Sequence, residues 1–132
     1  LKDLIVKMKE VADNSSGKFN LNFDYPQEIP DINLLPETKR NIFFIYKEVM
    51  NNIIKHSGAK NVNIRFKIED YNMLLSIKDD GKGFNINDSF NGNGIKNIKS
   101  RAKEINAELK FESSPGNGTI LELFSSITQM RD

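Results

Sequence analysis

A stripe of polar side chains with the chemistry of a phosphate site runs along one predicted helix. Glu48, Asn52, Lys55 and His56 are spaced by four, three and one residues, which places them on one side of a helix. The side-chain carbonyl of Asn52 is a hard oxygen ligand that suits Mg²⁺, and Lys55 carries a charge that neutralises phosphate. A solvated helix face has the same pattern, so the stripe alone does not define a site.

A second polar group is the hexapeptide from Asp79 to Phe84, which directly follows a predicted strand. The carboxylate of Asp79 suits the exocyclic amine of a base as a hydrogen-bond acceptor, and Gly81 and Gly83 permit close approach of the backbone. An ordinary Asp-Gly hairpin turn explains the hexapeptide equally well.

Two further glycine-rich segments follow. Gly92 to Ile95 opens a predicted helix, so its unpaired backbone N–H groups and the positive end of the helix dipole would face a bound anion. Gly116 to Thr119 separates the last two predicted strands, where Thr119 adds a hydroxyl. A flexible turn and a hairpin turn are the alternatives, so each segment is weak evidence by itself.

The elements that would position these residues follow from hydrophobic periodicity. Apolar residues at helical spacing predict helices over residues 1–12, 36–58 and 95–105, with Pro36 suited to a first turn and Gly58 to a helix exit. Period-two alternation predicts strands over 19–23 and 62–68. The run 73–78, which follows a turn, predicts a hairpin with 62–68, and apolar residues on both sides of the turn 115–118 predict a second hairpin of 109–111 with 120–124. Strands that follow helices favour a two-layer α/β sandwich of the α+β type.

Length and composition limit the classes of function. The chain has 132 residues, enough for one substantial core, and its 19 basic and 18 acidic residues leave a net charge of +1. This balance gives no bias toward nucleic acid or a membrane surface, so an anion would need a local site. The absence of cysteine fits the cytoplasm, and no apolar run is long enough to cross a bilayer. Because the chain begins with Leu1 rather than methionine, we expect it to be a piece of a longer protein. An inner-membrane anchor upstream of this piece stays open.

Taken in order, the four segments resemble the boxes of the GHKL ATPases, the superfamily shared by DNA gyrase, the mismatch-repair ATPases and histidine kinases. Residues 48–56 match the N box, 79–84 and 92–95 match the two glycine boxes, and 116–119 match the closing Gly-x-Gly-Thr. The extension 55–59, the short lid 85–91 and residues 97–101 are similar to sensor kinases that pair with helix-turn-helix response regulators. The resemblance implies the Bergerat fold, in which helices cover one face of a mixed sheet.

The resemblance also implies roles for individual residues. Asp79 would contact adenine, Asn52 would bind Mg²⁺, Thr119 would support the adenine end, and Glu48 matches an acidic residue that some members use as a general base. The full set implied to bind ATP is Asn52, Lys55, His56, Asp79, Gly81, Gly83, Phe84, Gly92, Asn93, Gly94, Ile95 and Thr119. Asp80 stands where many relatives have asparagine, and either repulsion near phosphate or a second metal contact would follow from it.

The function implied is transfer of the γ-phosphate of Mg-ATP to a histidine on an adjacent dimerisation domain, in a bacterial two-component system. We expect residues 1–13 to be the end of a preceding dimerisation helix and residues 14–132 to be the catalytic domain, monomeric alone and part of a homodimeric parent. A response regulator would be the downstream partner. His56 is the only histidine and continues the N-box helix, so we expect it to line the site rather than accept phosphate. An anti-sigma-factor-type serine kinase of the same fold and a non-catalytic nucleotide-binding module stay open as alternatives.

Overall fold

The chain folds around one five-stranded sheet. The computed structural model describes residues 1–15, 17–84 and 92–126. The strands lie in the order β1-β2-β3-β5-β4, with β1 parallel to β2 and each remaining pair antiparallel. Their bounds are β1 Asn20–Asp24, β2 Asn61–Glu69, β3 Asn72–Asp79, β4 Glu108–Ser113 and β5 Thr119–Ser126. The sheet is therefore mixed, and both predicted hairpins are confirmed.

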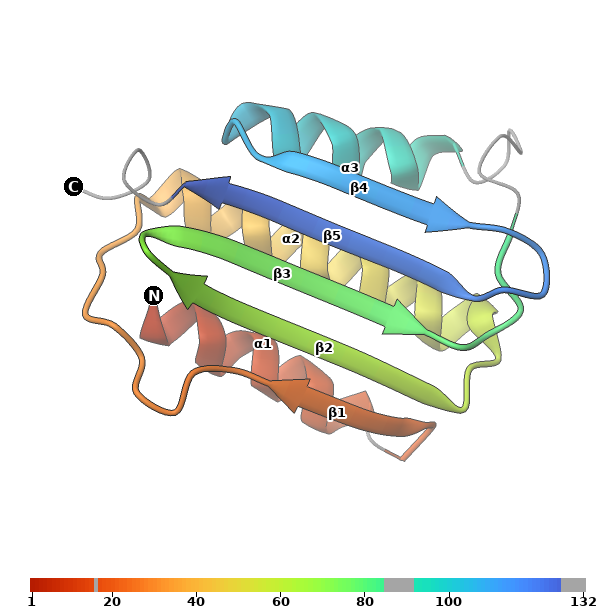
Figure 1. The fold of residues 1–132 in the computed structure, drawn as a ribbon. Helices are drawn as coiled ribbons and strands as arrows, with labels where there is room; N and C mark the ends of the chain where they lie inside the picture. The colour runs from red at the N-terminus through yellow and green to blue at the C-terminus, as the bar shows by residue number, and fades with distance from the viewer. Residues whose placement is uncertain (16, 85–91, 127–132) are drawn as a thin grey trace.

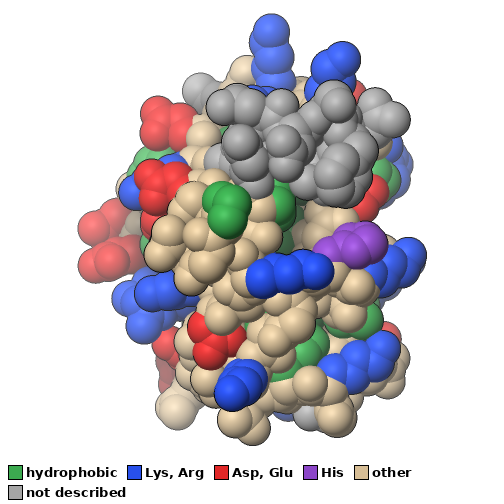
Figure 2. All heavy atoms as spheres, turned by 90° about the vertical axis from the view of Figure 1, so that its right-hand side faces the viewer, with side chains coloured by type: hydrophobic (Ala, Val, Ile, Leu, Met, Phe, Trp, Pro, Cys, Tyr) green, Lys and Arg blue, Asp and Glu red, His purple; other side chains and the backbone are tan. Residues whose placement is uncertain are grey.

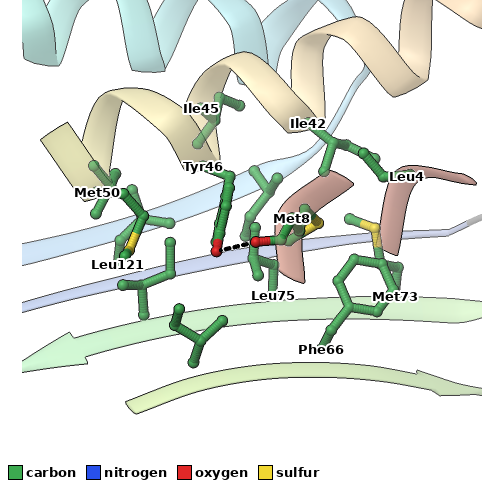
Figure 3. Packing of buried hydrophobic residues seen from close by; sticks show 14 of the residues in the cluster. Leu4, Met8, Ile42, Ile45, Tyr46, Met50, Phe66, Met73, Leu75 and Leu121 are labelled. Carbon is green, nitrogen blue, oxygen red and sulfur yellow. Dashed lines mark hydrogen bonds between the residues drawn. The ribbon is translucent and has the colours of Figure 1, made fainter. Parts of the chain in front are cut away.

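Helices α1 (Lys2–Ser15), α2 (Pro36–Asn52) and α3 (Gly92–Glu104) lie behind the sheet in Figure 1, on one of its faces. The inward-facing residues of the strands alternate with exposed ones, as in Val62, Ile64 and Phe66 of β2. These residues pack against the apolar side of α2, where Ile42, Tyr46 and Met50 are fully buried (Figure 3). The expected two-layer sandwich of the Bergerat type is confirmed.

The first helix belongs to the same core. Leu4, Ile5, Met8 and Ala12 on α1 are buried, and the Tyr46 hydroxyl donates a buried hydrogen bond of 2.7 Å to the carbonyl oxygen of Met8 (Figure 3). Undocking α1 would expose these side chains and leave a buried hydroxyl without its partner. Whether this helix also ends a preceding dimerisation helix stays a prediction.

The second helix differs in detail from the continuous helix predicted up to Gly58. It is α-helical through Asn52, continues as a π-helical turn, η1 (Ile53–Ser57), and stops at Gly58 in the left-handed conformation, with φ of 60°. A π-turn closes i→i+5 hydrogen bonds and is wider than an α-turn, so it rotates the residues that follow relative to the helix before it. Hydrophobic periodicity cannot distinguish the two over five residues.

The elements named by the motifs meet at one end of the sheet, on the right in Figure 1. There β3 ends at Asp79, whose neighbours across the sheet are Val62 at the start of β2 and Thr119 at the start of β5. The π-turn η1 and the first residues of α3 lie at the same end (Figure 1). In the described ranges 1–15, 17–84 and 92–126, none of the helices has the length and apolar character to cross a membrane.

Candidate nucleotide site

A pocket of about 340 Å³ opens at this end of the molecule. Figure 2 looks onto this end and shows apolar side chains recessed among backbone and polar side chains. The walls come from the end of α2 with η1, the loop after β3, the start of α3, and β4 with β5. The lining residues are Val49, Asn52, Ile53, His56, Ser57, Asp79, Lys82, Gly83, Phe84, Gly94, Ile95, Phe111 and Thr119.

Most of the residues predicted from the sequence meet in this pocket. Its walls contain Asn52, His56, Asp79, Gly83, Phe84, Gly94, Ile95 and Thr119, and they do not include Glu48, Lys55 or Gly81. Gly92 and Asn93 form the first turn of α3, but their surroundings lie outside the described part of the chain, as does the predicted lid 85–91. The four motifs thus converge on one cavity although they are far apart in the sequence.

The π-turn accounts for the different positions of Lys55 and His56. In a regular α-helix both residues would flank the line that passes through Asn52. The wider π-turn brings His56, four residues after Asn52, closer to that line. It moves Lys55, three residues after Asn52, away from the line. His56 accordingly lines the pocket, whereas Lys55 is exposed outside its walls. Glu48 lies one α-helical turn before Asn52 and is half-buried beyond the pocket wall.

Asp79 is the buried acid of the pocket, with only 3% of its surface exposed. Its Oδ1 accepts a hydrogen bond of 2.8 Å from the backbone N–H of Gly81. Among the residues that the structure describes, none donates a hydrogen bond to its Oδ2, and the side chain lines the pocket. Burial raises the pKa of this carboxyl above its ordinary value, the Gly81 bond opposes that shift, and the neighbouring charge of Asp80 adds to it.

Two glycines in the loop after β3 are required by packing. A Cβ on Gly81 would collide with the carbonyl oxygen of Ser57, and Gly83 has φ of 64° and faces the carbonyl oxygen of Ser114. Any side chain at either position would push the loop away from its neighbours. Gly94 is different, because a Cβ there would lie 3.9 Å from Nδ2 of Asn52, an ordinary contact across the pocket.

The far wall of the pocket is tied together by hydroxyl groups. The backbone N–H of Phe84 donates to Oγ of Ser113 at 2.9 Å, and this oxygen lies 2.9 Å from Oγ1 of Thr119. The ring of Phe84 contacts that of Phe111, with centroids 5.9 Å apart. Thr119 therefore stands beside Asp79 in the sheet and also anchors the strand that carries Phe111 through Ser113.

Sequence reasoning did not select five of the lining residues: Val49, Ile53, Ser57, Lys82 and Phe111. The apolar ones had a clear signal as core residues, but a pocket wall and a core produce the same hydrophobic pattern. Lys82 lies inside the first glycine box and could have been selected from that position alone. Ser57 lies inside the extension 55–59, but the resemblance assigned it no role in the site.

The pocket has the donor set of a nucleotide site. Apolar walls suit the faces of a base, buried Asp79 offers an acceptor for its amine, and Asn52 offers a neutral oxygen ligand at the other side. Across the described residues, no group of three or more histidine, cysteine or acidic side chains could hold a metal ion. A divalent cation here would accordingly be held by Asn52 together with oxygens of a bound phosphate.

Comparison with solved structures supports the class of fold. The histidine kinase domain of the blue-light-activated kinase of Erythrobacter litoralis EL346 superposes with a TM-score of 0.73 at 19% identity, covering 96% of this chain and 60% of that one. The Acinetobacter baumannii histidine kinase AdeS gives 0.66 at 16% identity, covering 95% of this chain and 64% of that one. At these identities the similarity defines the fold alone, which this chain shares with the two histidine kinase structures.

The family model for histidine kinase-, DNA gyrase B- and HSP90-like ATPases matches residues 37–128, and the chain belongs to this family. Among curated proteins, the sensor protein VraS of Staphylococcus epidermidis is 33% identical over 125 residues, which is 93% of this chain and 33% of that protein. Sensor protein VraS of Staphylococcus aureus is 30% identical over 124 residues, again 93% of this chain and 33% of that protein. The chain spans about a third of the length of these relatives.

Proposed function

We propose that this chain is the ATP-binding catalytic domain of a sensor histidine kinase, which holds Mg-ATP and presents its γ-phosphate to a histidine on an adjacent dimerisation domain. The observation that carries the proposal is the pocket that joins Asn52 on α2 to the buried carboxylate of Asp79 at the end of β3. The similarity to VraS, a sensor protein, favours a kinase over the other branches of the family.

Each wall of the pocket has a task in this proposal. The free oxygen of Asp79 accepts a hydrogen bond from the adenine amine, and Val49, Ile53 and Phe111 contact the apolar faces of the base. Thr119 supports Asp79 from the neighbouring strand. The base end of the site is thereby formed by the sheet and by the side of α2 that faces it.

The phosphate end lies toward the start of α3. The backbone N–H groups that open this helix are oriented by the helix itself, and the positive end of its dipole attracts phosphate. The side-chain amide of Asn52 faces Gly94, with its Nδ2 3.9 Å from where a Cβ on that glycine would stand. The oxygen of the same amide would complete the shell of Mg²⁺, which would supply charge neutralisation at the phosphates when bound. Lys55 stays a predicted phosphate contact outside the present pocket wall, and Glu48, which is also outside it, is the least supported of the proposed catalytic residues.

The nucleophile is proposed to come from another domain. Phosphoryl transfer needs a group in line with the leaving oxygen, whereas His56 extends from the same helix as Asn52 and lines the nucleotide pocket itself. The proposed partners are a dimerisation domain that carries the acceptor histidine and, through the complete kinase, a response regulator. The proposed location of the domain is the cytoplasm.

The test is calorimetric titration of the chain with a non-hydrolysable ATP analogue, with and without Mg²⁺, beside Asp79→Ala and Asn52→Ala. We expect Asp79→Ala to abolish measurable binding and Asn52→Ala to keep Mg²⁺-free binding while losing the gain from Mg²⁺. Absence of adenine-nucleotide binding by the unsubstituted chain would refute the proposal and favour a non-catalytic module. In the complete kinase, an acid-labile phosphoryl product identifies histidine as acceptor, whereas an acid-stable one identifies a serine kinase.

A further inference from the structure

The loop after β3 is joined to the connection between α2 and β2 by hydrogen bonds on both sides of Gly81. On one side, the N–H of Lys82 donates to the carbonyl oxygen of Ser57 at 2.8 Å. On the other side, the N–H of Asp80 donates to the carbonyl oxygen of Asn61 at 3.2 Å. We call the connecting segment, residues 57–61, the clasp.

The carboxylate of Asp80 provides the other bonds to the clasp. Its Oδ1 accepts from the backbone N–H groups of Lys60 and Asn61, each at 2.9 Å, and its Oδ2 accepts from the side-chain amide of Asn61 at 2.8 Å. These bonds to the charged form lower the pKa of the carboxyl. Asp80 is not part of the pocket wall. Both of its oxygens are therefore engaged by the protein, outside the wall of the pocket.

We propose that Asp80 is a positioning residue and does not contact metal or phosphate. Its bonds to the clasp hold Asp79 and Gly81 in the position that nucleotide binding needs. Gly81 stands between the two anchor points, and its N–H is the partner of Asp79 Oδ1. With this N–H fixed, one oxygen of Asp79 is occupied and the other is left for the base. The inference rests on the proposed function, since it assigns a role within the same nucleotide site.

The contacts also predict which substitutions at position 80 preserve the hydrogen bonds to the clasp. An asparagine at position 80 can accept both backbone N–H groups through its carbonyl oxygen. Its amide nitrogen would then face Asn61, whose exposed side chain can turn over and present its own oxygen. Asn20, which donates to Oδ1 of Asn61 at 3.3 Å, can turn over in the same way. An alanine at position 80 leaves all three donors without this acceptor.

The experiment measures the Kd of the ATP analogue with and without Mg²⁺ for Asp80→Ala, Asp80→Asn and a control, Glu69→Ala. The control removes an exposed carboxylate from the far end of β2. We expect Asp80→Ala to raise Kd about tenfold under both conditions, the lower end of what losing a partner that orients a ligand-binding group costs. Asp80→Asn and Glu69→Ala should stay within about twofold of the unsubstituted chain.

Two results with the Asp80 variants would overturn the inference. Asp80→Ala could leave Kd unchanged while lowering the melting temperature, which would make the clasp purely stabilising. Asp80→Asn and Asp80→Ala could both lose only the gain from Mg²⁺, which would make Asp80 a metal ligand. If Asp80→Ala does not fold, Asn61→Ala, which removes one of the three donors, must raise Kd by a few fold.

The role of the clasp can also be separated from the proposed function. If the unsubstituted chain binds no adenine nucleotide, that proposal fails, and amide hydrogen exchange then tests the clasp alone. Faster exchange of the Gly81 and Lys82 amides in Asp80→Ala than in Asp80→Asn would support the positioning of the loop. Equal exchange in the two variants would refute it.

Discussion

Replacing Asp79 with asparagine should make the chain more stable and at the same time weaken nucleotide binding. The carboxyl is 3% exposed, and burial raises its pKa above the ordinary value of 3.8. Because the pKa is higher in the folded chain, folding favours the neutral acid. The stability that the neutral acid contributes is fully present below pH 3.8 and is lost as the pH rises through the pKa of the folded chain. At neutral pH, the ionised carboxylate therefore destabilises the empty domain.

The magnitude follows from the contacts of the side chain. Asparagine keeps an oxygen for the N–H of Gly81 and removes both the buried charge and its repulsion with Asp80. Each pKa unit by which burial disfavours the charge corresponds to about 1.4 kcal/mol. We therefore expect the free energy of unfolding at pH 7 to increase, and in a domain of this size each gain of about 1 kcal/mol raises the melting temperature by about 4 °C.

Binding should change in the opposite direction. Once the amide oxygen introduced by Asp79→Asn accepts from the N–H of Gly81, the amide nitrogen takes the place of Asp79 Oδ2 and directs a donor at the donor of the adenine amine. A polar pair left unsatisfied in a buried site costs about 1 to 3 kcal/mol, which corresponds to a roughly ten- to hundredfold rise in Kd.

The assay combines thermal unfolding with calorimetric titration of the unsubstituted chain and Asp79→Asn. The stability difference should be present at pH 7 and disappear below pH 3.8, where the acid is neutral in both states. Asp80→Asn is the matched comparison, because hydrogen bonds lower the pKa of Asp80 and its contribution is instead lost as the pH falls. An Asp79→Asn chain that is less stable at pH 7, or that binds nucleotide normally, would refute the reasoning.

Two further substitutions test the packing that holds the site. Tyr46→Phe removes the buried bond to the carbonyl oxygen of Met8 and should lower the free energy of unfolding by about 1 kcal/mol in urea denaturation; an unchanged midpoint would mean that α1 is not held by this bond. Gly81→Ala places a Cβ against the carbonyl oxygen of Ser57 and 2.9 Å from Asp79 Oδ1, so it should reduce nucleotide affinity at least about tenfold. Gly17→Ala is its control and should bind normally, because a Cβ added there would meet no atom within 4 Å in the part of the chain that the structure describes.

The sheet and the helix faces were predictable because their signals are local and repeated. Alternation in residues 62–68 predicted a half-buried strand, the run 73–78 predicted its hairpin partner, and the antiparallel register pairs Ile64 with Ile77 and Phe66 with Leu75. The buried side of α2, with Ile42, Tyr46 and Val49, followed from helical spacing in the same way. These patterns extend over several helical turns or strand residues. A single residue that departs from the pattern therefore does not change the predicted element.

The pocket wall was less predictable, since it depends on single residues at the ends of elements. Lys55 and His56 are adjacent in the sequence and were expected to share one stripe, but the π-turn leaves only His56 on the wall. The role of Asp80 was also hard to predict, because it depends on a residue far away in the sequence. Its partner Asn61 lies 19 residues earlier, and nothing near Asp80 in the sequence indicates that its charge is engaged there.

The geometry of the site depends on the fit between α2 and the sheet. Asp79 is fixed within the sheet by its neighbours Val62 and Thr119, whereas Asn52 stands on α2 just before the π-turn. The two ends of the pocket are thus on different layers, and the buried contacts of Val49 and Ile53 set the separation between them. Because both side chains also line the cavity, truncating either one would alter the shape of the proposed base site and its distance from Asn52 together.

The carboxylate of Asp80 acts on the same loop by a different route. Its bonds run to Lys60 and Asn61, which follow η1 and lie outside the apolar wall between Asn52 and Asp79. A change at Asp80 therefore alters the position of the loop after β3 relative to the pocket. It leaves the side chains of Val49 and Ile53 in the pocket wall. We propose that an exposed carboxylate outside the pocket wall affects binding in this way, through the position of the loop.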